Sequence, residues 1–181
     1  MFRTLPRPLA WAGAAVLAAS LAAAQIERLD LGQMVNRTDN AVHGRVVEKE
    51  VIRIDSPTDG PELYFTHLTV EGVSLFDGKK IRVPVTFGGG FISPEEGVHN
   101  SEAPSADETR IGAEVVVFYK WTDNMGGGLA ANALYAWHGG IYRVAETQNG
   151  PVVLGKGDGF AIESNVRMAD LRVQIAEKRV K

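Results

Sequence analysis

The chain has 181 residues, of which 19 are basic and 22 are acidic, so its formal net charge is −3 at pH 7. An acidic chain is poorly suited to nucleic acid, because phosphate contacts dominate that affinity, and it has no polybasic run for anionic lipid. It contains no cysteine, which excludes disulfides, thiol chemistry, cysteine-based metal sites and a lipoprotein anchor.

The first 24 residues have the organisation of a secretory signal peptide. Arg3 and Arg7 give a positive start, residues 9–21 form an apolar stretch, and residues 22–24 are alanines. The apolar stretch is shorter than the ~20 residues that span a bilayer. We expect cleavage before Gln25, export to the periplasm or the medium, and no transmembrane segment in the mature chain.

The mature chain, 25–181, predicts one small antiparallel β-barrel domain with a short helix at each end. The N-terminal helix, over 30–38, begins at a capping box formed by Asp30 and Gln33. The C-terminal helix begins at Ser164, which caps it. Its predicted core residues are Val166, Leu171, Ile175 and Ala176.

A long hairpin is predicted at the start of the barrel, on either side of the turn at 56–61. Pairing the strands about that turn places Lys49 near His67. It also places Arg45 near Glu71, so that opposite charges face each other across the strands. The acidic–basic–acidic step around Lys49 indicates a bulge or bend.

Further short strands follow, separated by turn signals every 8–15 residues, which is typical of an antiparallel barrel or sandwich. Residues 88–110 form a long loop, and the continuous apolar run at 115–121 indicates a central strand. Residues 134–144 predict a hairpin through Gly139 and Gly140. The other strands are expected at 81–87, 151–154 and 160–162.

A set of apolar and turn residues occurs in a recognisable order between Met34 and Trp121. The set consists of Val42-x-Gly44-x-Val46, the turn Phe76–Lys79, and Gly112-x-Glu114 followed by Val115–Phe118. This order resembles small exported bacterial proteins of unassigned function. It also resembles the netrin-like domain, an OB-type barrel that includes the tissue inhibitors of metalloproteinases. The resemblance implies an OB-like or netrin-like barrel, but those inhibitors bind the protease zinc through an N-terminal cysteine that this chain lacks.

The four histidines have no close metal-ligand spacing. His43 and His67 lie on strands that we expect to pair, and they are weak candidates for a metal site. Glu48, Glu50 or Glu71 would have to supply the third ligand. Exposed strand histidines are the simpler interpretation, so no metal and no cofactor are expected. The chain also lacks the serine motifs of nucleophilic catalysis, which favours a non-catalytic protein.

Aromatic residues gather in the second half of the chain, and some of them must face out of alternating strands. OB-type barrels bind ligands through such a face, although core packing would give the same composition. The candidate binding residues are Trp121, Tyr135, Trp137, Phe91 and His99. They predict an exported, non-catalytic binding or interaction module, with another exported protein as a partner. The alternatives are a protease-associated or inhibitor-like protein, whose loop enters an enzyme cleft, and a metal-binding envelope protein or enzyme.

Overall fold

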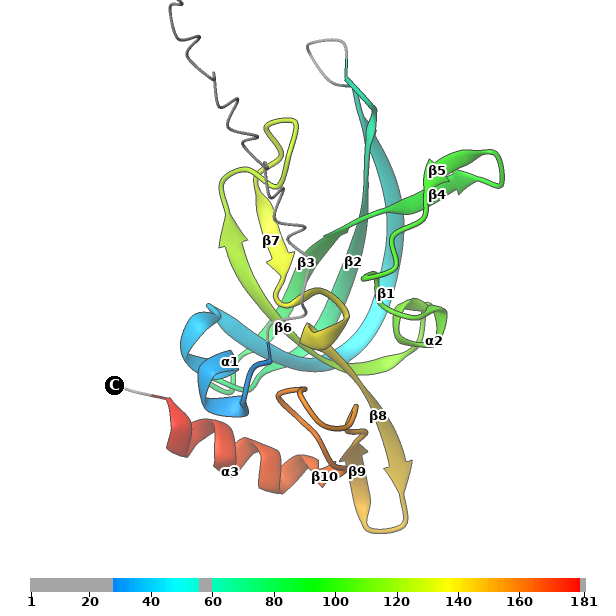
Figure 1. Ribbon diagram of the computed structural model, residues 1–181. Helices are drawn as coiled ribbons and strands as arrows, with labels where there is room; N and C mark the ends of the chain where they lie inside the picture. The colour runs from blue at the N-terminus through cyan, green and yellow to red at the C-terminus, as the bar shows by residue number, and fades with distance from the viewer. Residues whose placement is uncertain (1–27, 56–59, 180–181) are drawn as a thin grey trace, which may run out of the picture.

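The computed structural model describes residues 28–55 and 60–179 (Figure 1). The predicted signal peptide and its cleavage site lie outside the described residues. In chain order, the elements are α1 (Leu31–Arg37), β1 (Asn40–Ile54), β2 (Leu63–Ser74), β3 (Lys80–Gly88), β4 (Gly90–Ser93), β5 (Glu96–Val98), α2 (Ala106–Thr109), β6 (Glu114–Thr122), β7 (Ala131–Leu134), η1 (Trp137–Gly140), β8 (Ile141–Thr147), β9 (Gly150–Val153), β10 (Val166–Arg167) and α3 (Met168–Lys178).

Five of the strands form a closed barrel in the order β1-β2-β3-β7-β6, with β6 returning to β1. The neighbours are antiparallel except β3 and β7, which pair in parallel at Thr86 and Ala133. This is the arrangement of an OB-like barrel, so the predicted fold class is confirmed. The long β1 strand curves around the barrel (Figure 1) and pairs with β2 on one edge and β6 on the other.

The register of the β1–β2 hairpin is as predicted only at the end far from the turn. Arg45 lies opposite Glu71, but His67 lies opposite Glu50 instead of Lys49. A β-bulge in β1 between these two pairs shifts the register by one residue.

β6 is buried on both faces, as its continuous apolar run predicted. Val115 and Val117 point into the barrel, whereas Val116 and Phe118 point outward beneath the helices. A second apolar core therefore lies against the outside of the barrel, where β6, β8 and β9 pack against α1 and α3. Its buried residues include Met34, Tyr142, Val153, Leu171 and Ile175.

The two terminal helices are both present, but only α1 begins where the sequence predicts. Asp30 and Gln33 form the expected capping box. α3 begins at Met168 rather than Ser164, because residues 166–167 extend into β10 and pair with β9. Ala176, predicted to face the core, is exposed.

Two predicted strand assignments near the C-terminus are wrong. Residues 134–144 are not a hairpin, because β7 and β8 both pair with β6 along the same edge and η1 links them. Residues 160–162 form a bend instead of a strand. The backbone there folds back on the preceding turn, where the Lys156 amide donates to the Ile162 carbonyl at 3.0 Å.

The segment between β3 and β6, predicted as a long loop, contains structure of its own. β4 and β5 form a small hairpin that stands out from the barrel, and α2 is a single helical turn below it (Figure 1). Ser105 and Glu108 form a capping box on α2. None of the helices in the described part of the chain is long and apolar enough to cross a membrane.

Candidate functional site

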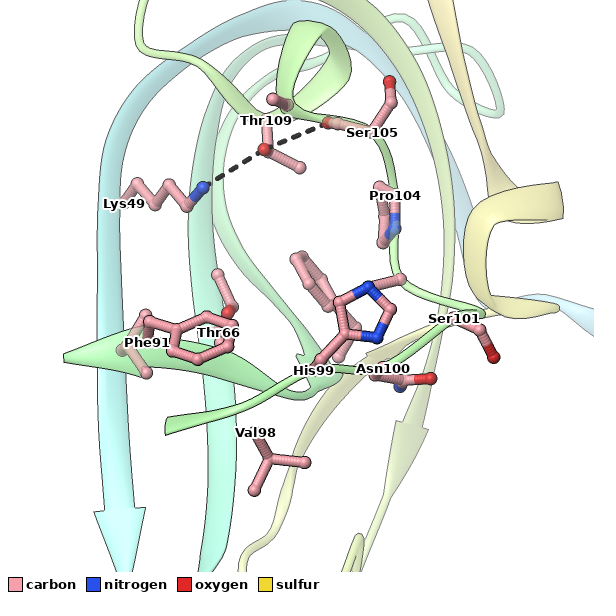
Figure 2. A pocket seen from close by; sticks show the side chains of 15 residues that line it. Lys49, Thr66, Phe91, Val98, His99, Asn100, Ser101, Pro104, Ser105 and Thr109 are labelled. Carbon is pink, nitrogen blue, oxygen red and sulfur yellow. Dashed lines mark hydrogen bonds between the residues drawn. The ribbon is translucent and has the colours of Figure 1, made fainter. Parts of the chain in front are cut away.

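A cleft of about 670 Å³ lies between the β1–β2 hairpin and the segment that joins β3 to β6. Figure 2 shows the cleft between Lys49, Thr66 and Phe91 on one side and residues 99–105 on the other. The cleft is apolar over much of its surface, and no aspartate or glutamate belongs to its lining. The apolar side chains are Val51, Phe87, Phe91, Val98, Ala103, Pro104 and Ala106.

The close contact between β4 and the β1–β2 hairpin at the cleft depends on Gly90, the first residue of β4. Gly90 has a φ of +136°, and an added Cβ would lie 2.5 Å from the Thr66 hydroxyl and 3.0 Å from Val51. Because Gly90 has no side chain, the start of β4 can pack directly against β1 and β2 where the chain turns away from the barrel. Two hydrogen bonds fix the backbone between β3 and β4. The Thr66 hydroxyl donates to the Gly89 carbonyl at 2.7 Å, and the side-chain amide of Asn100 donates to the Gly88 carbonyl at 2.8 Å.

The opposite wall, α2, is anchored by an ion pair beneath it. Glu108 is only 5% exposed, and its carboxylate lies 2.5 Å from the Lys156 ammonium. The second carboxylate oxygen accepts from the amide and the hydroxyl of Ser105. Lys156 also donates to the His138 carbonyl and lies over the ring of buried Tyr142. These contacts tie the cleft wall to η1 and β8.

Lys49 brings a positive charge into the cleft. Its ammonium donates to the Thr109 hydroxyl at 3.2 Å and makes no ion pair within residues 28–55 and 60–179. Four of the five carboxylates in the segment around it are bound to another cation or to a histidine, and the fifth, Glu95, accepts a hydrogen bond from Ser93. The four pairs are Glu96–Arg53, Glu102–His138, Asp107–Arg143 and Glu108–Lys156.

Two of the five predicted binding residues line the cleft. Phe91 and His99 point into it (Figure 2), and the His99 ring forms neither a hydrogen bond nor an ion pair with the rest of the described chain. Trp137 packs behind the segment, with its ring over Gly88. Tyr135 packs against the second core.

Trp121, the fifth predicted residue, lies apart from the cleft on β6. Its side chain is 51% exposed, and the indole N–H donates to Asp123 at 2.8 Å. The structure thus places the aromatic candidates in three separate environments. Lys49, Thr66 and Asn100 were missed as site residues, because they come from distant parts of the sequence and belong to no motif.

The two candidate metal ligands, His43 and His67, do not come together. His43 lies opposite Val73, which is six residues from His67 along β2, or about 20 Å. The His43 ring instead contacts the Glu114 carboxylate at 2.8 Å, and the His67 ring contacts the Thr86 hydroxyl at 2.6 Å. Burial lowers the pKa of His67. Across the described residues, no group of three or more histidine or acidic side chains could hold a metal ion.

Comparison with known proteins adds nothing to this geometry. No protein family, curated protein or solved structure matches the chain. The function is therefore argued from the cleft itself.

Proposed function

We propose that this protein is an exported, non-catalytic binding module whose ligand seats in the cleft between the β1–β2 hairpin and residues 88–109. The observation that supports this proposal is the cleft itself. Its volume of about 670 Å³ falls within the range of small-molecule sites. It also combines apolar walls with a few polar groups that point inward, which is the usual composition of such sites.

Three of the four lining hydroxyl groups hold the cleft wall together, which supports binding over catalysis. Thr66 and Thr109 donate their hydroxyl protons to backbone carbonyls. Ser105 donates to Glu108, the residue that completes the cap of α2, and that carboxylate is also paired with Lys156.

Export rests on the composition of the first 24 residues, with their basic start and alanine-rich apolar stretch. The full chain should be expressed with its own N-terminus in a bacterial host, and the product should be recovered from the periplasm or medium. Sequencing of its N-terminus should give Gln25 as the first residue. An uncleaved protein in the cytoplasm would contradict export without affecting the cleft.

Binding in the cleft can be tested with phenylnaphthylamine, a neutral apolar dye that fluoresces on leaving water. We expect saturable binding to the wild-type protein and at least a tenfold loss in Phe91→Ser or Val98→Ser. These side chains are 52% and 45% exposed, so the substitutions should leave the fold intact. Val173→Ser on α3 is the matched control, because Val173 is 57% exposed and lies outside the cleft. Equal binding by all three variants would exclude the cleft as the dye site.

A second candidate, an inhibitor-like role, is favoured by the protruding β4–β5 hairpin (Figure 1). Ile92 on this hairpin is 50% exposed and is not part of the cleft lining. If the hairpin enters an enzyme cleft, Ile92→Ser should abolish capture of an exported protease from the native host. The same variant should leave dye binding in the cleft unchanged. Capture that persists in Ile92→Ser would remove the hairpin from such a role.

A further inference from the structure

The cleft lining contains the cationic side chain of Lys49 and no carboxylate. We infer that its ligand is a small amphipathic anion, whose single negative headgroup binds Lys49 and whose apolar body lies against Phe91 and Val98. This inference rests on the proposed binding function and specifies the class of ligand.

The ammonium of Lys49 has donors to spare. An ammonium has three donors, and within the described residues only one of them is used, toward the Thr109 hydroxyl at 3.2 Å. The nearby carboxylates of Glu96, Asp107 and Glu108 are already paired with Arg53, Arg143 and Lys156. No carboxylate belongs to the cleft lining, so an incoming anion meets the Lys49 ammonium there and no acidic side chain among the lining residues.

Exposed apolar side chains line the cleft together with that cation. The Phe91 ring and the Val98 side chain are 52% and 45% exposed, so a ligand can cover them without displacing the protein's own packing. Figure 2 shows Phe91 beside Thr66, with the Lys49 ammonium above them, the His99 ring across the opening and Val98 at the lower end. Such an arrangement pairs an apolar surface with a donor at one end, which matches a molecule with one charged end.

The net charge of the chain bears on which ligands the cleft selects. The chain carries a formal net charge of −3, so its average surface repels anions. A locally positive cleft on such a chain concentrates anions at one place and gives no advantage to neutral or cationic amphiphiles. The imidazole of His99, which makes no polar contact within the described residues, can supply a second donor to the same headgroup.

Two dyes of nearly the same shape test the inference. Anilinonaphthalene sulfonate carries one negative charge, whereas phenylnaphthylamine lacks the sulfonate. In Lys49→Met, which keeps most of the apolar stem, we expect the sulfonate dye to bind about tenfold more weakly and the neutral dye to bind as before. Lys49→Arg should restore the sulfonate dye. Lys120→Met is the matched control, because Lys120 is an exposed strand lysine on β6, outside the cleft.

Competition then identifies the headgroup. Decanoate and decyl phosphate, used below their micelle concentrations, should each displace the sulfonate dye from the wild-type protein. Their ratio of affinities separates a carboxylate ligand from a phosphate ligand. Decanol and decyltrimethylammonium should displace it at least tenfold less well.

The possible results separate this inference from the proposed function. Equal binding of both dyes by wild type and Lys49→Met, with loss in Phe91→Ser, would keep the cleft as a binding site and overturn the anion inference. Binding insensitive to Phe91→Ser would overturn both. If Lys49→Met does not fold, the wild-type protein decides: raising salt from about 0.05 to about 0.5 M should weaken the sulfonate dye only. Equal salt dependence for both dyes would overturn the inference.

Discussion

The ammonium of Lys156 and the carboxylate of Glu108 lie 2.5 Å apart beneath the wall of the cleft, with side chains 18% and 7% exposed. The pair joins α2 to the turn that follows β9, two parts of the chain far apart in sequence. The position of α2 in the cleft wall therefore depends on the pairing of these two largely buried charges. The stability of this wall can therefore be tested separately from ligand binding.

Removing one member of this pair should destabilise the protein strongly. Lys156→Met leaves the Glu108 carboxylate buried without its cation, and we expect the free energy of unfolding to fall by about 3–5 kcal/mol. Urea denaturation followed by tryptophan fluorescence measures the loss. Arg143→Met is the control, because its pair with Asp107 is exposed and should contribute less than about 1 kcal/mol. Equal losses in the two variants would contradict the structural role of the buried pair.

Gly90 should tolerate no side chain. In Gly90→Ala the new methyl group would lie 2.5 Å from the Thr66 hydroxyl, so β4 must shift and the cleft must change shape. Gly150 has a similar positive φ of +95° but no atom within 4 Å of an added Cβ. Gly150→Ala therefore measures the backbone strain alone, at about 1 kcal/mol. We expect Gly90→Ala to cost more than that and to lose dye binding. The same melting temperature for both variants would mean that β4 adapts without cost.

Ionisation of Tyr142 should weaken the fold in alkali. Burial raises the pKa of this phenol from 10.0 to about 12. Because the folded state favours the neutral form, its stabilising contribution is complete below pH 10 and is lost as the pH rises toward 12. The loss should reach about 2–3 kcal/mol. Denaturation of Tyr142→Phe between these pH values should lack this component. A parallel decline in wild type and variant would assign the alkaline loss to other groups.

Ala136 and Trp137 both have positive φ, of 53° and 52°, at the point where β7 ends and η1 begins. This conformation is strained for side chains, and most of all for β-branched ones. Ala136→Val should therefore lower the free energy of unfolding by about 1–2 kcal/mol, whereas Ala136→Gly should raise it by about 0.5 kcal/mol. Urea midpoints give the order of stability. Equal urea midpoints for Ala136→Val and Ala136→Gly would show that the backbone between β7 and η1 rearranges freely.

The barrel could be predicted from the sequence because its signals are local. The capping box of Asp30 and Gln33 marks α1, and the apolar run at 115–121 marks a strand buried on both faces. α2 was missed although Ser105 and Glu108 have the spacing of a capping box, because the polar residues around them indicated a loop.

The predicted hairpin at 134–144 failed because two glycines were interpreted as a turn. Neither Gly139 nor Gly140 has positive φ. Gly140 is needed for space instead: an added Cβ would overlap the Tyr135 carbonyl. Sequence alone does not separate these two uses of glycine.

Most of the cleft was also beyond prediction. Phe91 and His99 were identified by residue type and by their place in a long segment. Lys49 was assigned only to strand pairing, because its importance depends on which carboxylates are bound elsewhere. Those pairs arise from the tertiary structure: Glu96 and Arg53, for example, are 43 positions apart in the sequence.

The segment between β3 and β6 supplies most of the residues that line the cleft, whereas the barrel strands contribute Lys49, Val51, Thr66 and Phe87. It begins beside Gly88 and is fastened by Asn100 and Glu108. Substitutions at residues such as Phe91 and Val98 therefore change neither apolar core, because these side chains are exposed. The exposed side chains of the cleft and the residues of the two apolar cores are therefore largely separate positions, so the segment can change in sequence, or be redesigned to bind a chosen ligand, on an unchanged scaffold.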